Sequence, residues 1–68
     1  MQKLIIFIHQ LIFRFYEGAH LFNMSLSLRA LGQNEEAISL AKSALAIFEE
    51  IESPHAETVR KALAEWSG

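Results

Sequence analysis

A glycine between two helix-like stretches constrains this chain more than any other feature. Residues 19–31 carry apolar side chains at positions 21, 24, 28 and 31, a spacing typical of a helix that packs against a partner. Gly32 follows at once, and glycine adopts the positive φ that ends a helix at little cost. Residues 34–51 then place alanine at 37, 41 and 44 on one face, where small side chains let two helices approach closely. The pattern predicts an antiparallel helical hairpin that turns at Gly32.

Capping residues mark the ends of the neighbouring elements. Asn34 is a favourable N-cap for the second helix, and the two glutamates after it suit the positive end of the helix dipole. Ser53 before Pro54 predicts a further N-cap with proline in the first helical position. Apolar residues at 59, 62, 63 and 66 then predict a third helical stripe.

These residues together resemble the tetratricopeptide repeat, a helix–turn–helix unit of about thirty-four residues. Residues 21–25 are similar to the Leu-x-Asn-Leu-Gly segment of the longer, kinesin-light-chain-like repeats, and the late position of Pro54 also fits that subtype. The resemblance covers residues 18–52, with 53–68 as a following, cap-like helix. Departures from the family pattern are Ser25, Leu28, Asn34 and Ala41, and residues 1–17 hardly match.

The resemblance implies two sets of functional positions. In the family, the first helix of each repeat lines a concave groove that receives a peptide or a partner helix. Carried over by position, the groove residues are Ala19, Phe22, Asn23, Leu26, Arg29 and Ala30. The positions that pack the two helices together are Leu21, Met24, Ser25, Leu28, Gly32, Ala37, Ala41, Ala44 and Leu45.

The first seventeen residues are unusually apolar. Residues 4–16 include ten apolar side chains, yet this run is shorter than the roughly twenty residues of a membrane span, and His9, Gln10 and Arg14 interrupt it. We expect a separate helix that packs on residues 19–31 in place of a preceding repeat, giving four helices in all. Two alternatives are a membrane-surface helix formed by residues 1–16 and a stretch left by truncation that is not a designed element.

Composition excludes several classes of function. The net charge is −2 and the six basic residues are scattered, which gives no electrostatic basis for binding nucleic acid. The chain has no cysteine, and its three histidines show no metal-binding spacing. Adjacent glutamates on a helix point about 100° apart and do not converge on a substrate. We therefore expect no enzyme activity, no cofactor and no metal.

The sequence predicts an all-α protein made of residues 1–17, a hairpin over 18–52 and a capping helix over 53–68. A single repeat leaves an apolar face open, so we expect a protein–protein interaction module, a scaffold or adaptor segment. Its partner would be a peptide, a helix of another protein, or a second copy of the chain. The alternatives are a peripheral membrane protein and a remnant of a longer repeat array without independent function. With no targeting signal recognised, the cytoplasm is the default compartment.

Overall fold

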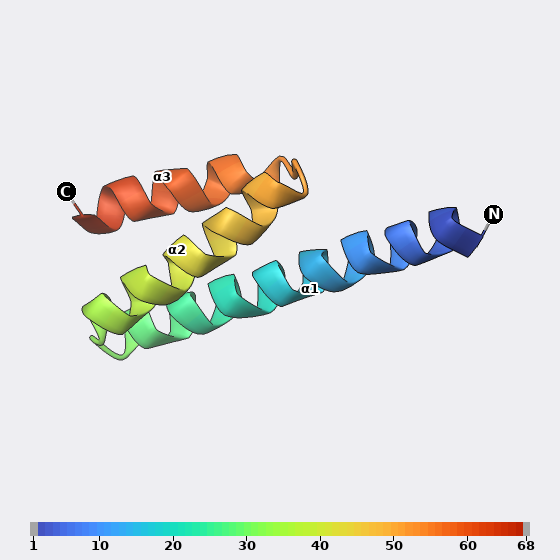
Figure 1. Cartoon of the computed structure of the whole chain (residues 1–68). Coiled ribbons are helices and arrows are strands. Elements are labelled where there is room, and N and C mark those ends of the chain that lie inside the picture. Colours follow the sequence, from blue (N-terminus) through green and yellow to red (C-terminus); the bar gives the residue numbers. More distant parts are fainter. Residues whose placement is uncertain (1, 68) are drawn as a thin grey trace.

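The structure is a computed structural model that describes residues 2–67. Met1 and Gly68, the outer residues of the predicted segments 1–17 and 53–68, lie outside this range. The described residues form three helices and no strand: α1 over Gln2–Ala30, α2 over Asn34–Glu50 and α3 over His55–Ser67. In Figure 1, α1 and α2 form an antiparallel hairpin and α3 folds back along α2. The predicted all-α class and the packed helical hairpin are confirmed.

The prediction of four helices is wrong for residues 2–67, because α1 runs without interruption through Gly18. Glycine inside a helix costs about 1 kcal/mol relative to alanine, but alone it does not end one. Residues 15–21 contain no proline and none of the usual N-cap residues Ser, Thr, Asp or Asn. Arg14 also forms an i, i+3 ion pair with Glu17 just before Gly18. Residues 2–17 therefore extend the first helix of the hairpin and do not fold back onto it.

Small side chains let α1 and α2 approach closely. Ala37, Ala41 and Ala44 of α2 are 0% exposed, and Gly18 and Ser25 are buried on α1. The Ser25 hydroxyl donates a hydrogen bond of 2.6 Å to the carbonyl oxygen of Phe22 within the same helix. This bond satisfies a polar group that would otherwise be costly to bury.

An aromatic cluster joins all three helices at the other end of the hairpin. The ring centroid of Phe15 on α1 lies 6.0 Å from that of Phe48 and 5.3 Å from that of His55. Phe48 and His55 are 5.6 Å apart, and the buried residues Ala56 and Val59 complete the core under α3. Aromatic pairs at such distances add about 0.5–1.5 kcal/mol beyond their buried area.

Two Schellman motifs end α1 and α2. After α1, Gln33 N–H donates to the Leu28 carbonyl at 2.9 Å, and Gly32 has a φ of +84°. After α2, Ser53 N–H donates to the Phe48 carbonyl at 2.8 Å, and Glu52 holds the equivalent left-handed position with a φ of +54°.

The caps that start α2 and α3 differ. Ser53 caps α3 as expected, because its hydroxyl accepts the His55 N–H at 3.2 Å. The prediction that Asn34 caps α2 is wrong. Gln33 occupies the N-cap without a side-chain hydrogen bond, and its carbonyl accepts the Ala37 N–H at 3.0 Å. The Asn34 side chain instead accepts a long hydrogen bond of 3.4 Å from Arg29.

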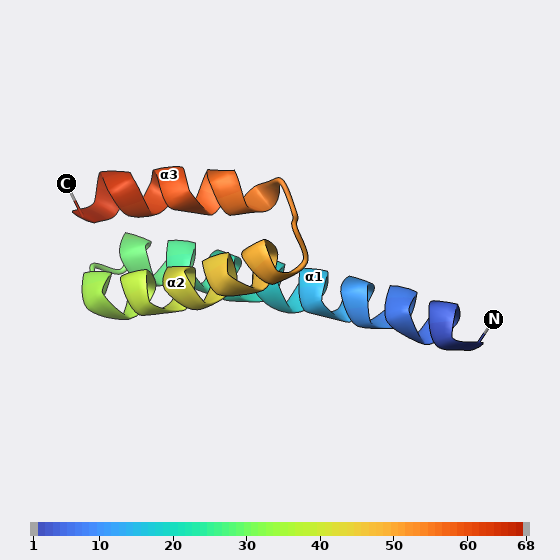
Figure 2. The same cartoon turned by 45° about the horizontal axis from the view of Figure 1, so that its top comes forward.

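The N-terminal part of α1 projects beyond the hairpin. Figures 1 and 2 show this part of α1 extending away from α2 and α3, and residues 2–10 are all exposed. The described chain is consequently about 47 Å long and only 18 by 12 Å across.

Candidate interaction surfaces

Helix α3 partly covers the predicted groove. The Phe22 ring stacks on Trp66 with centroids 6.2 Å apart and planes inclined by 18°. The Arg29 guanidinium lies 5.2 Å from the centre of the Trp66 ring, which makes a cation–π contact. Ala19 is half-buried against the core, whereas Asn23, Leu26 and Ala30 are exposed.

What remains of the groove between α1 and α3 is a recess of about 190 Å3. Its walls come from Ala19, Phe22 and Asn23 on α1 and from Thr58 and Val59 on α3, among others. Ligand pockets usually enclose about 300–1,000 Å3, so this recess is small even for a compact ligand. It suits at most one inserted side chain of a larger partner.

The predicted packing positions occupy varied environments. Ser25 and the three alanines are fully buried, and Gly32 forms the turn. Leu21, Leu28 and Leu45 are half-buried. Met24 is 42% exposed, because it lies about 100° around the helix from Ser25 on a side of α1 that α2 does not cover.

The most prominent surface lies outside both predicted sets. Its large apolar side chains are each between 46% and 70% exposed. We call these residues the α1 apolar surface: Leu4, Ile5, Ile6, Phe7, Ile8, Ile12, Phe13 and Tyr16. Fully exposed side chains of this size present roughly 150–250 Å2 each, so together the eight expose on the order of 1,000 Å2. The largest apolar patch of a typical monomer is about 300–600 Å2. The apolar run in the sequence identified these residues as unusual, but it did not predict that they would be exposed to solvent.

A second, larger recess lies where α2 ends above α1. It encloses about 680 Å3 between the α1 residues Phe7 and Leu11 and the α2 end at Glu50 and Ile51, with Arg14 on its wall. The α1 apolar surface runs into this recess from the N-terminal side. The recess thus lies at the boundary between the part of α1 that α2 covers and the part that it leaves exposed.

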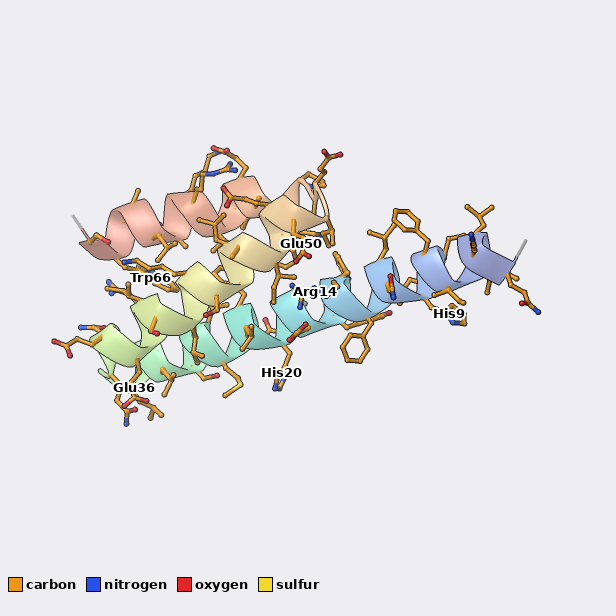
Figure 3. The ribbon with its side chains drawn as sticks, viewed as in Figure 1. His9, Arg14, His20, Glu36, Glu50 and Trp66 are labelled. Carbon is orange, nitrogen blue, oxygen red and sulfur yellow. The ribbon has the colours of Figure 1, made fainter. Side chains whose placement is uncertain are left out.

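An ion-paired arginine lies at this recess. Arg14 binds Glu17 of its own helix at 2.7 Å. It also binds Glu50 in the last turn of α2, and Figure 3 labels these two side chains where the helices meet. The hydrogen bond to Glu50 is the main cause that raises the Arg14 pKa above its ordinary value. The negative charges of Glu50 and Glu17 and the hydrogen bond to Glu17 raise the pKa further. Arg60 on α3 forms a similar pair of bonds, to Glu57 at 2.8 Å and to Glu49 at 3.0 Å.

Residues 2–67 contain no group of three or more side chains that could hold a metal ion. His9 and His20 both lie on α1 and point away from α2 and α3 (Figure 3). None of the helices described here combines the length and apolar character needed to cross a bilayer.

Comparison with protein-family models, with curated proteins and with solved structures gave no significant match. The resemblance to the tetratricopeptide repeat therefore stays an interpretation of the sequence.

Proposed function

We propose that the chain is a protein–protein interaction module, in which a tetratricopeptide-like hairpin carries an extended apolar helix that binds a protein partner. The observation that carries this proposal is the α1 apolar surface. It is larger than the patches that monomers usually expose, and each of its eight side chains is at least 46% exposed. Burial of such a surface contributes about 25 cal/mol per Å2 of apolar area removed from water, which offsets the entropy lost on association.

The charge pattern supports a protein partner over a lipid surface. Helices that lie on membranes usually carry many basic residues on their polar face. Within residues 2–16, the basic side chains of α1 are Lys3 and Arg14, and Arg14 is already bonded to Glu17 and Glu50. One remaining lysine gives weak attraction to anionic lipid, since each basic residue near such a surface contributes about 1 kcal/mol.

Site-specific photo-crosslinking in cells that express the chain tests this function. A benzophenone side chain replaces Phe13, which is 70% exposed within the α1 apolar surface. The matched control places the same group at Lys42, which is exposed on α2 and outside this surface. We expect protein adducts from position 13 and not from position 42. Adducts with lipid alone, or none at position 13, would contradict the proposal.

A further inference from the structure

We infer that the occupant of the α1 apolar surface is a second copy of this chain, bound with the two α1 helices antiparallel and crossing near Phe7. This inference rests on the function proposed above and names the partner. Three observations support it: the course of one stripe along α1, the charges at the two ends of that stripe, and the available area.

The first observation is that α1 carries one continuous contact stripe, of which α2 covers only part. Gly18 and Ser25 are buried under α2. Successive steps of seven, four and three residues lead back from Gly18 to Leu11, Phe7 and Leu4, which therefore lie on the same side of the helix. Cover by α2 ends near Arg14, where Glu50 bonds to it. The N-terminal third of the stripe is left open.

α2 packs antiparallel to α1 on the covered part of this stripe. A helix that packed on the open part in the same direction as α2 would likewise be antiparallel to α1. The open part spans residues 2–11, about 15 Å at 1.5 Å per residue, so it accepts a short apolar segment. The same segment of a second copy meets this requirement. With Phe7 opposite Phe7 of the second copy, Leu4 of each chain lies opposite Gln10 of the other. One two-fold contact then buries this side of α1 in both copies, which closes the assembly at two chains.

The second observation is that the two ends of the stripe carry opposite charge. The first turn of α1 contains Lys3 and no acidic residue, and it is the positive end of the helix dipole. The end of α2 bears Glu49, Glu50 and Glu52 at the negative end of its dipole. Antiparallel pairing brings Lys3 of each copy toward the acidic end of α2 in the other. Parallel pairing would instead place the two Lys3 side chains together.

The third observation concerns area. The α1 apolar surface exposes on the order of 1,000 Å2, and one helix-to-helix contact covers about half of it on each chain. Two such halves bury roughly 1,000 Å2, near the lower limit for a specific protein interface. We therefore expect a reversible dimer whose population depends on concentration.

Single-cysteine crosslinking of the full chain tests this arrangement, since the natural sequence contains no cysteine. In an antiparallel pair centred on Phe7, only Phe7→Cys places a thiol opposite its own copy, within the Cα separation of about 7 Å that a disulfide tolerates. Leu4→Cys is the matched control, because a parallel pair would join position 4 to itself. A mixture of Leu4→Cys with Gln10→Cys keeps Phe7 intact and should form the mixed dimer.

We expect light scattering of the natural chain to give twice the monomer mass at high concentration. Phe7→Cys and the mixed pair should form disulfides at least about tenfold faster than Leu4→Cys alone, because pairing holds the reacting thiols at millimolar effective concentration. A monomer at every concentration, or equal crosslinking of Leu4→Cys and Phe7→Cys, would overturn the inference.

The two proposals fail separately. If position 13 crosslinks to a different protein and the purified chain stays monomeric, self-association is excluded while the interaction function stands. If the chain stays monomeric and binds only phosphatidylcholine vesicles, both proposals are wrong.

Discussion

The ring of Phe48 lies directly against the backbone of Gly18, such that a Cβ atom at position 18 would stand 2.9 Å from Cε1 of Phe48. The same atom would lie 3.2 Å from Cγ2 of Ile47. Phe48 is buried between Phe15 and His55 and has little room to move. The absence of a side chain at Gly18 therefore sets how closely the C-terminal part of α2 approaches α1.

We expect Gly18→Ala to lower the free energy of unfolding by about 1 kcal/mol. Overpacking of a core costs about 1–3 kcal/mol, and the better helix propensity of alanine returns about 1 kcal/mol. Urea denaturation followed by helical circular dichroism measures the change. Phe48→Leu is the control background, because it removes the ring and should make the added methyl group less costly. A stabilised Gly18→Ala variant would show that the helices can separate freely.

The alanine contact between α1 and α2 supports a second prediction. Ala41 is fully buried in this contact, so Ala41→Leu should lower the free energy of unfolding by about 2–3 kcal/mol by forcing the helices apart. Ala46 is exposed on the same helix, and Ala46→Leu should change that free energy by less than about 0.5 kcal/mol. Thermal melts of the two variants provide the comparison, and similar losses in both would contradict the close packing.

Local chemistry explains why the hairpin could be predicted from the sequence. The positive-φ glycine determines one turn, and the stripe of alanines determines one helix–helix contact. Both features can be recognised from the spacing of residues in the sequence. The continuity of α1 could not be predicted in this way, because the resemblance to the repeat family begins at residue 18 and therefore favoured a separate helix before it. Whether a glycine ends a helix depends on the capping partners that follow it, and none follows Gly18.

Long-range aromatic contacts limited the prediction of the site. Phe22 and Arg29 share the Trp66 ring across more than thirty residues of sequence, and helical periodicity carries no information about such a pairing. The exposure of residues 4–16 depends on where α2 ends relative to α1, which is a property of the assembled hairpin. A long apolar run indicates that these residues are buried against another segment or another molecule, but it does not identify which one.

The two Schellman motifs provide a third prediction, because they place different residues in the same left-handed conformation. Gly32 tolerates this conformation, whereas Glu52 is strained by about 1 kcal/mol or more. Glu52→Gly should raise the free energy of unfolding by about 0.5 kcal/mol, since the relief of strain exceeds the added freedom of the unfolded chain. Gly32→Ala should lower it by about 1 kcal/mol.

Urea titration of these two variants checks the prediction. Glu52→Gln separates conformation from charge, because glutamine keeps the strained backbone but removes the negative charge at the end of α2. If Glu52→Gln stabilises the chain as much as Glu52→Gly does, the effect is electrostatic and the argument from backbone strain is wrong.

The contact of Phe22 with Trp66 gives the last prediction. Trp66 is the only tryptophan, so its fluorescence reports directly on the packing of α3 against α1. Phe22→Ala removes the ring stacked on Trp66 and should shift the emission to longer wavelength as water reaches the indole. Arg29→Gln should cost about 0.5–1 kcal/mol through the lost cation–π contact, with a smaller shift. Asn23→Ala is the matched control, because Asn23 is exposed beside Phe22. An equal shift in Asn23→Ala would show that α3 does not depend on the stacked pair.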